Sequence, residues 1–559
     1  MEWSTACPDW EKRIVAGEPL IVCPTLFPDE AADARRMFDL LRLVDVRGEP
    51  AIGEISRPWL KQFADAVFGS YDPISGRRLI REFMLLVAKK NAKSTIAAAI
   101  MLTALLRTWR KSGELLILAP TIEIANNSFF PARDMVRADP ELSDLLHIQD
   151  HYRTITHRAT NSVLKVVAAE NETVAGKKAS VVLIDELWQF GKRANAENML
   201  REATGGLASR PEGCVIYLST HSDEAPAGVF KQKLGYFRGV RDGRIKDKRA
   251  LPVLYEFPNA LIEDESFKRP DRWRITNPNL GASVDEEFIE RELAKAENSG
   301  EESLRGFYAK HLNVEIGLRI LSDAWVGATY WERRGDKSLT LEALIDRSDI
   351  VCIGVDGGGL DDLLGLAILG RDAVSRQWLL TGHSWAHNSV LERRKSEASR
   401  LRDFARAGEL TIVERLGQDI DELADIVEHV DASGKLYQVG FDPFGVGAIV
   451  DALAERGVAG DSKVVSVTQG WRLTGAIKTT ERKLADGTLV HSGSGLMTWA
   501  VGNAKVEPRG NAIVITKQAS GTAKIDPLMA AFDAVALMAT NPGAAMSTAY
   551  TAEGGLIVL

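Results

Sequence analysis

The sequence predicts an α/β protein with at least two domains, and three observations support this. Up to about residue 310, short apolar runs rich in β-branched residues alternate with longer amphipathic patterns, as in a parallel sheet covered by helices. Beyond that point, aspartates close or open further apolar segments that can form a second sheet and its helices. A length of 559 residues with 45% hydrophobic content is ample for more than one core.

The strands expected in the first half are short runs of aliphatic and aromatic residues: 83–87, 115–119, 181–184 and 214–219. A charged helical stretch over 285–305 and an irregular run over 317–349 follow, and we place the domain joint there. The expected divisions are an N-terminal segment 1–50, a first α/β domain 51–260, a linking region 261–340, a second α/β domain 341–540 and a flexible tail 541–559.

Composition excludes several classes of protein. The four cysteines, Cys7, Cys23, Cys214 and Cys352, lack metal-ligand spacing and are expected to be reduced and structural. The chain has neither a signal-peptide core at its start nor an apolar run of membrane-spanning length, so we expect a cytoplasmic, non-secreted protein without a membrane partner. A net charge of −8 argues against nonspecific coating of nucleic acid, although a local basic channel remains compatible with it.

A lysine-rich loop lies between the strand 83–87 and an expected helix. It reads Val87-Ala88-Lys89-Lys90-Asn91-Ala92-Lys93-Ser94-Thr95. The spacing of the phosphate-loop consensus puts glycines where Val87 and Ala92 stand, so the pattern itself is not matched. The chemistry is available nevertheless, because backbone N–H groups at a helix start, the Lys93 ammonium and the Ser94 hydroxyl can hold phosphates and magnesium.

The three lysines of this loop have two interpretations. They can form an ordinary basic helix start, although positive charge at a helix N-terminus is unfavourable. They can also bind an anion, in which case Lys89 and Lys90 add positive charge near a γ-phosphoryl group. The electrostatic cost of the first interpretation favours the second.

Two later strands end in residues that suit a nucleotide site. Asp185 and Glu186 follow four aliphatic residues, where Asp185 can hold magnesium and Glu186 can polarise a water molecule. The next strand ends in Ser219 and Thr220, whose hydroxyls can contact the γ-phosphate or the attacking water. An ordinary strand end is the alternative for this second pair.

Three aspartates mark the second half of the chain. Asp356 and Asp442 each close an apolar strand, and Asp526 opens a helical stretch. Each alone is typical of a turn or a helix cap, but carboxylates gathered in one cleft repel one another and need a cation. Oxygen ligands favour magnesium or manganese over zinc, and two such ions roughly 3.5–4 Å apart support phosphodiester cleavage.

Two further aspartates are candidates for the same site. A tight turn at Gly357-Gly358-Gly359 predicts a hairpin that brings Asp362 near Asp356, whereas Asp361 is expected to face solvent. Asp533 lies nearly two helical turns after Asp526 and so shares its face, in a supporting position.

The ordered set of motifs from about residue 50 to 540 resembles the large terminase subunits of tailed bacteriophages. The resemblance is carried by the basic loop 88–94, Ile184-Asp185-Glu186, Ser219-Thr220, the segments 57–63, 276–281 and 308–313, the pair Asp356 and Asp362, Phe441-Asp442-Pro443 and Lys524-Ile525-Asp526-Pro527. It implies an N-terminal P-loop ATPase with a parallel central sheet over 51–260, a lid or linker over 261–340 and a ribonuclease H-like nuclease over 341–540.

The resemblance also implies cofactors and roles. ATP with Mg²⁺ would be held by Gln62, which would read adenine, and by Lys89, Lys90, Asn91, Ala92, Lys93, Ser94, Thr95, Asp185, Ser219 and Thr220, with Ser94 and Asp185 on the metal. Mg²⁺ or Mn²⁺, as two ions, would be held by Asp356, Asp362, Asp442 and Asp526. The catalytic residues would be Glu186, Asp356, Asp442 and Asp526.

Such a protein is expected to drive double-stranded DNA into a procapsid and to cut concatemeric DNA in the cytoplasm of a bacterial host. The implied partners are a portal protein, a small terminase subunit and further copies in a ring on the portal, with a monomer in isolation. The trans-acting arginine finger is open among Arg158, Arg201 and Arg210. Two alternatives are a nuclease scaffold with a decayed ATPase, which Ala92 favours and Lys93 opposes, and a repair helicase-nuclease, which would separate strands.

Overall fold

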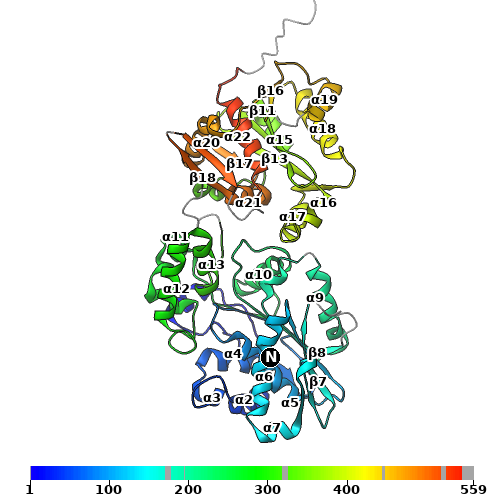
Figure 1. Ribbon diagram of the computed structural model, residues 1–559, viewed down its shortest axis with the longest axis vertical. Helices are drawn as coiled ribbons and strands as arrows, with labels where there is room; N and C mark the ends of the chain where they lie inside the picture. The colour runs from blue at the N-terminus through cyan, green and yellow to red at the C-terminus, as the bar shows by residue number, and fades with distance from the viewer. Residues whose placement is uncertain are drawn as a thin grey trace, which may run out of the picture. The chain divides into compact units, whose positions relative to one another are not determined.

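The computed structural model divides into two compact units, residues 1–316 and 317–559 (Figure 1). It describes residues 2–169, 178–193, 195–317, 325–442, 447–510, 512–517 and 524–543. Pro443 and most of the tail expected over 541–559 lie outside these ranges. Within them, no helix combines the length and the apolarity that crossing a membrane requires.

The first unit is built on an eight-stranded sheet with the order β10-β3-β9-β8-β4-β7-β6-β5. The strands are β3 (Glu82–Leu86), β4 (Glu114–Ala119), β5 (Leu146–Gln149), β6 (Thr154–His157), β7 (Ser162–Ala168), β8 (Ala179–Ile184), β9 (Cys214–Ser219) and β10 (Ala250–Leu254). From β10 to β7 all neighbours are parallel, and β6 and β5 add an antiparallel edge. The predicted parallel α/β fold is confirmed.

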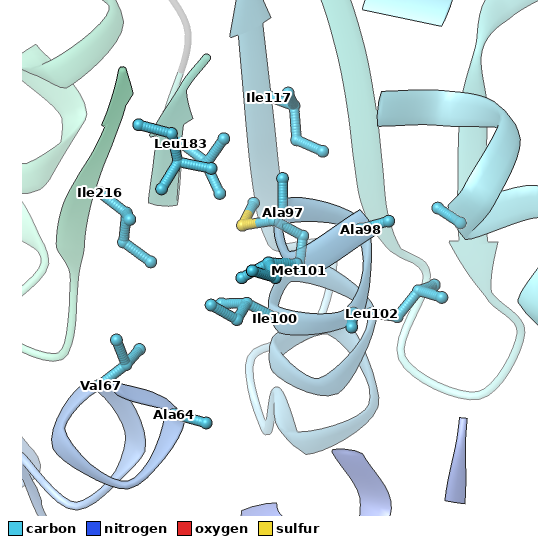
Figure 2. Close-up of a cluster of buried hydrophobic side chains, with 14 of the residues drawn as sticks. Ala64, Val67, Ala97, Ala98, Ile100, Met101, Leu102, Ile117, Leu183 and Ile216 are labelled. Atoms are coloured by element: carbon cyan, nitrogen blue, oxygen red, sulfur yellow. The ribbon is translucent and has the colours of Figure 1, made fainter. Parts of the chain in front are cut away.

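Both faces of this sheet are apolar, which explains why its central strands are nearly continuous hydrophobic runs. Phe83 and Leu85 point into the core on one face, and Met84 and Leu86 into the core on the other. Figure 2 shows helix α5 (Lys93–Arg107) on the first face, with Ala97, Ile100 and Met101 between the strands and helix α4 (Pro58–Phe68).

The other elements of this unit complete its two helical layers and its edges. They are the short strands β1 (Tyr71–Asp72) and β2 (Arg77–Arg78), the helices α1 (Trp10–Ala16), α2 (Pro28–Leu40), α3 (Ile52–Ile55), α6 (Ile122–Arg137), α7 (Pro140–Leu145), α8 (Leu187–Phe190), α9 (Ala196–Gly205), α10 (Gly228–Arg241), α11 (Asn259–Glu263), α12 (Glu286–Ser299) and α13 (Glu301–His311), and the 3₁₀ turns η1 (Asp150–Tyr152), η2 (Gly206–Ser209), η3 (Ser266–Lys268) and η4 (Pro270–Ile275).

The second unit contains a mixed sheet with the order β14-β13-β12-β11-β15-β16, and β17 also pairs with β13. Its strands are β11 (Ser348–Gly357), β12 (Leu363–Asp372), β13 (Trp378–His387), β14 (Leu410–Val413), β15 (Leu436–Phe441), β16 (Val464–Ser466) and β17 (Leu489–His491), with a separate hairpin of β18 (Ala504–Arg509) and β19 (Ala512–Lys517). β11 runs antiparallel to β12 and parallel to β15. The predicted hairpin is present, and Gly357, Gly358 and Gly359 all have positive φ.

Helix α22 (Asp526–Met538) lies against β11 and β12, and glycines permit this close approach. A Cβ atom on Gly354 would lie 2.0 Å from the Ala530 carbonyl oxygen, and one on Gly365 would lie 3.0 Å from the Asp526 carbonyl oxygen. The first distance excludes a Cβ atom, and the second is tight enough that the helix would have to shift slightly. The glycines therefore fix how near the first turn of α22 comes to the strand ends.

The remaining helices of this unit cover the two faces of the sheet. They are α14 (Ala328–Trp331), α15 (Leu341–Arg347), α16 (Asn388–Arg393), α17 (Ala398–Arg406), α18 (Gln418–Ala432), α19 (Gly447–Glu455), α20 (Thr474–Asp486) and α21 (Gly495–Asn503), with the 3₁₀ turns η5 (Glu332–Arg334) and η6 (Gly470–Leu473). The expected linking region 261–340 is thus divided between the two units. Trp325 and Trp331 from it are fully buried in the second unit, where Trp331 stacks on His491 with ring centroids 3.9 Å apart.

We predict that a fragment 317–559 folds stably and that a fragment 341–559 is much less stable, because the shorter one lacks both tryptophans. Losing a buried tryptophan costs about 3–5 kcal/mol, a large part of the roughly 5–15 kcal/mol that stabilises a typical domain. Urea unfolding of the two fragments measures the difference. Equal midpoints would show that residues 325–340 contribute nothing to this core.

Candidate active sites

The lysine loop connects β3 to α5, and two of its residues adopt the left-handed conformation. Lys90 has φ +71° and Ala92 has φ +61°. For a residue with a Cβ atom this conformation costs about 1–2 kcal/mol, which is why glycine is usual at such a position. The methyl group of Ala92 packs against the apolar core. The loop therefore keeps the required backbone course in spite of the substitution.

The side chain of Asn91 stabilises this strained loop by hydrogen bonds. Its side chain is fully buried, and its amide nitrogen donates to the Ala88 carbonyl at 3.1 Å and to the Asn277 side-chain oxygen at 2.8 Å. Its own side-chain oxygen accepts from the Asn279 backbone N–H at 3.0 Å. The segment 276–281 thus serves as a support for the loop, and Asn91 is placed to shape the loop.

The lysines of the loop differ in their surroundings. Lys89 and Lys90 are exposed, whereas Lys93 is only 6% exposed and begins α5. Ser94 and Thr95 follow it in the first turn of the helix and are partly buried. Because Lys93 lies 3.8 Å from a carboxylate oxygen of Glu186, the structure brings the loop and the acidic strand end together.

Asp185 and Glu186 follow β8 and differ in burial. Asp185 is fully buried and accepts hydrogen bonds from the Ser128 hydroxyl at 2.8 Å and from the Glu186 backbone N–H at 2.9 Å. Burial, together with the neighbouring Glu186 carboxylate, raises the pKa of Asp185 to about 6. Such a carboxylate is stabilised by a cation. The indole N–H of Trp188 donates to the Glu186 carboxylate.

Ser219 and Thr220 lie at the end of β9, beside both the loop and the acidic pair. The Ser219 carbonyl accepts from the Val87 backbone N–H at 3.1 Å, and the Ser219 hydroxyl accepts from the Trp188 backbone N–H at 3.1 Å. Thr220 is buried, and its carbonyl accepts from the Ser219 hydroxyl at 2.9 Å. These bonds connect the loop, the acidic strand end and the Ser-Thr pair into one polar network.

Gln62 lies on α4 and lines a cavity of about 170 Å³. Ile21, Cys23, Pro24 and Leu26 form much of its apolar wall, and Asp65 and Thr25 add polar groups. A cavity with both apolar walls and polar groups can hold a ring that carries hydrogen-bonding edges, such as a nucleobase. Trp59, on the same helix, donates to the Asn279 side chain at 2.9 Å and so ties α4 to the support of the loop.

In the second unit, Asp356 and Asp442 lie at adjacent strand positions. Val355 pairs with Phe441 in the parallel ladder of β11 and β15, so the next residue of each strand is an aspartate at the same edge. Parallel strands necessarily bring their carboxyl ends together, and two carboxylates placed there repel each other.

Helix α22 adds two buried aspartates to this edge. A Cβ atom on Gly357 would lie 3.3 Å from a carboxylate oxygen of Asp526, which places Asp526 against the residue that follows Asp356. Asp533 is fully buried, and burial, with the charges of Asp356 and Asp442, raises its pKa to about 9. Asp356 and Asp442 thus lie near enough to act electrostatically on Asp533, and Asp526 lies beside Gly357 at the same end of β11.

Asp362 has a cationic neighbour. The Lys524 ammonium, which is 2% exposed, forms an ion pair with the Asp362 carboxylate and donates to the Asp361 carbonyl at 3.0 Å. The charge of Asp362 is thereby compensated within the chain. Asp362 has less need of a metal ion than the aspartates at the strand ends, and Asp361 is exposed, as its position in the turn predicted.

A different group of possible metal ligands is neutralised by arginines. Among the described residues, His221, Glu256 and Glu315 bring ligand atoms within 4.8 Å of one another. Arg238 forms ion pairs with both glutamates, and Arg241 lies 2.7 Å from Glu256. Burial opposes ionisation of Glu256, but the charge of Arg238 holds its pKa well below the ordinary value. This group is an internal ion-pair network.

Comparisons with known proteins identify two domains in the chain. The family described as "Terminase large subunit, endonuclease domain" matches residues 253–541, more than half of the chain, and "Terminase large subunit, ATPase domain" matches residues 58–239. The chain belongs to the terminase large subunit family. It carries an ATPase and an endonuclease, and these domains use a nucleotide and a divalent metal.

The chain is similar to three relatives and to one solved structure. Protein YmfN of Escherichia coli (strain K12) is 26% identical over 53% of this chain and 64% of that protein, so the chain spans slightly less than two thirds of YmfN. The terminase large subunit of Enterobacteria phage HK97 is 24% identical over 89% of this chain and 92% of that protein, and that of Lactococcus phage p2 is 22% identical over 81% of each. The crystal structure of the HK97 large terminase, at 21% identity, covers 91% of this chain and 99% of that one with a TM-score of 0.47.

The terminase also contains site residues that sequence reasoning missed. Ser128 orients Asp185, Trp188 holds Glu186, and the Gln469 amide donates to both carboxylate oxygens of Asp533 at 3.0 Å. Ser128 had a weak signal, since it is a small polar residue on the buried face of α6. Gln469 had none, because it lies in a loop far along the chain from its partner.

We predict that Ala92→Gly leaves ATP affinity unchanged or raises it, because glycine adopts φ +61° without steric cost. Ala92→Val should weaken ATP binding at least tenfold, since a β-branched residue at this φ is an outlier and would displace the loop. Calorimetric titration with a slowly hydrolysed ATP analogue measures both. A loss of affinity in Ala92→Gly would mean that the methyl group itself is required.

We also predict that metal-free protein loses stability as pH rises from about 4 to about 9, because Asp533 releases its proton with more difficulty when folded than when unfolded. The loss is at most about 1.4 kcal/mol per pH unit. Asp533→Asn should reduce this slope and raise the melting temperature at pH 8. The exposed Asp361→Asn serves as a control that should change neither. A lower melting temperature for Asp533→Asn at pH 8 would contradict the repulsion among these aspartates.

Proposed function

We propose that this terminase hydrolyses ATP at the lysine loop to move double-stranded DNA into a procapsid, and cuts concatemeric DNA at the acidic cluster of its second unit. One observation carries the proposal: a single chain holds a lysine loop beside an acidic strand end and, separately, four aspartates at another sheet edge, of which Asp526 and Asp533 are buried and Asp356 and Asp442 are half-buried. A motor that must also release its DNA needs both chemistries.

In the ATPase, each group has a role that follows from its position. Lys93 and the N–H groups at the start of α5 neutralise phosphate oxygens, with Ser94 and Asp185 as the magnesium ligands. Glu186 orients and polarises the attacking water, because it lies at the strand end with its carboxylate held by Lys93 and Trp188. A magnesium ion held there would compensate charge on the phosphates.

The other residues near the nucleotide site contribute charge, shape the loop or contact the base. Lys89 and Lys90 extend exposed ammonium groups over the phosphates, while Asn91 and Ala92 set the backbone course of the loop and Thr95 continues the first helical turn. Gln62 faces the cavity in which the base would lie. Ser219 and Thr220 connect the phosphate end to β9 and transmit the state of the nucleotide.

In the nuclease, Asp356 and Asp442 hold the divalent ions together with the carboxylates of α22. Asp526 would be the third ligand, near Gly357 at the helix N-terminus. Asp533, which lies further along α22, would support the ligands. Two Mg²⁺ or Mn²⁺ ions, if bound by these residues, would supply the activation of a water and the stabilisation of the leaving oxygen. Asp362 contributes weakly, because Lys524 already compensates its charge.

The partners follow from this role. Several copies form a ring on a portal protein in the cytoplasm of a bacterial host, a small terminase subunit selects the DNA, and the isolated chain is a monomer. A trans-acting arginine must reach a neighbouring copy. Arg158 and Arg201 are exposed and meet that condition, whereas Arg210 is partly buried against the Gly206 carbonyl.

We predict that variants separate the two activities of the full chain. Lys93→Ala should weaken ATP binding, and Glu186→Gln should keep binding but slow hydrolysis by about 10²-fold or more, since only the glutamate acts mainly on the water. Asp356→Asn, Asp442→Asn and Asp526→Asn should abolish Mn²⁺-dependent cleavage of duplex DNA and keep ATP hydrolysis. Steady-state ATPase and plasmid-cleavage assays measure these effects.

Two matched comparisons sharpen this test. Asp362→Asn should reduce cleavage only in part, and Asp533→Asn should do less damage than Asp526→Asn. If Asp533→Asn abolishes cleavage while Asp526→Asn cuts normally, the third ligand is Asp533. Normal cleavage by Asp356→Asn, or normal hydrolysis by Glu186→Gln, would sink the corresponding half of the proposal.

A further inference from the structure

Lys310 occupies an unusual position at the last turn of α13. Its ammonium nitrogen lies 3.0 Å from the centroid of the Trp188 ring and donates to the His221 carbonyl at 3.0 Å. Its own carbonyl accepts from the Lys89 N–H of the phosphate loop at 2.6 Å. One residue of the helical segment after the sheet therefore contacts the loop, the Ser-Thr strand end and the tryptophan beside Glu186.

Trp188 is the link from Lys310 to the chemistry. Its indole N–H donates to one Glu186 carboxylate oxygen, while Lys93 lies 3.8 Å from the other. When ATP binds, phosphate oxygens compete for the Lys93 ammonium. The indole is then the remaining side-chain donor, among those described here, that holds the Glu186 carboxylate in one orientation.

We propose that Lys310 is a positioning residue for ATP hydrolysis, which fixes the Trp188 ring by a cation–π contact and so orients Glu186. A cation over an aromatic face restrains the ring, and the contact strengthens when water is excluded. The inference rests on the proposed role of Glu186. It adds that the position of α13 over the loop controls how well the water is activated.

The surroundings of Lys310 act on its charge in both directions. Burial lowers the pKa of Lys310 to about 7, and Lys192 and Lys93 act in the same direction, whereas Asp223 and Glu186 favour the ammonium form. Because the ammonium is partly buried, each electrostatic contact that it makes is stronger than it would be in water.

Lys192 provides a matched control on the same indole. Its ammonium lies 5.4 Å from the Trp188 ring centroid, and it forms ion pairs with Asp223 at 3.0 Å and Glu224 at 3.1 Å. No hydrogen bond from it to the phosphate loop is found among the described residues. Lys192→Met therefore removes a comparable charge from the same region without removing the close contact.

The test is DNA-stimulated ATP hydrolysis by full-length Lys310→Met, Lys310→Arg, Trp188→Phe and Lys192→Met. We expect kcat to fall about tenfold in Lys310→Met and Trp188→Phe, a fraction of the roughly 10²–10⁴-fold contribution of a well-placed base, with KM for ATP within about threefold of wild type. Lys310→Arg should recover most of kcat, and Lys192→Met should match wild type.

Double variants distinguish positioning from a general structural effect. The double variant Lys310→Met with Trp188→Phe should hydrolyse ATP no more slowly than the slower single variant. Lys310→Met should also not slow hydrolysis by Glu186→Gln further, because Lys310 acts through Trp188 on Glu186. Additive losses, or wild-type kcat in Lys310→Met, would overturn the inference. If Glu186→Gln itself hydrolyses ATP normally, the proposed function of that residue fails first. If Lys310→Met does not fold, Trp188→Phe alone decides, and an unchanged kcat there is a negative result.

Discussion

Both units of this terminase depend on one electrostatic constraint: carboxylates gathered at the carboxyl ends of parallel strands repel each other in a site where water is scarce. Asp185 follows β8, Asp356 is the last residue but one of β11, and Asp442 follows β15, which pairs with β11. Burial, and after it the charge of neighbouring carboxylates, raises the pKa of both Asp185 and Asp533. A divalent cation relieves the repulsion, so the same arrangement that destabilises the metal-free protein selects its cofactor.

The rest of each unit serves to hold these groups in place. In the first, a loop that is strained at Ala92 is held through its own Asn91, which bonds to Asn277 and Asn279, so a segment that follows the sheet supports the lysine loop. In the second, Gly354 and Gly365 let α22 approach the strands closely enough to bring its aspartates to the sheet edge. In both units, the site depends on a contact between segments far apart in the sequence.

Much of this architecture could be predicted from the sequence because it is local. The strand ends at Asp185, Asp356 and Asp442 follow from apolar runs that stop at an acid, and the hairpin follows from three consecutive glycines. The environment of each acid could not be predicted in the same way. The pairing of Asp362 with Lys524, the amide of Gln469 on Asp533 and the contact of Lys310 with Trp188 all join residues that only the folded chain brings together. The sequence also did not indicate that Trp325 and Trp331, in the expected linker, belong to the core of the second unit, because isolated tryptophans show no helical or strand periodicity.

The most direct test of the electrostatic account is Mn²⁺ binding to the nucleotide-free full-length chain, followed by electron paramagnetic resonance of the free ion. The account predicts saturable binding in wild type, loss of that binding in Asp356→Asn, and its retention in Asp185→Asn, whose site requires the phosphates of ATP as further ligands. No saturable binding in wild type, or undiminished binding in Asp356→Asn, would contradict this, because it would show that the carboxylates at the end of β11 and on α22 are not held together by a cation.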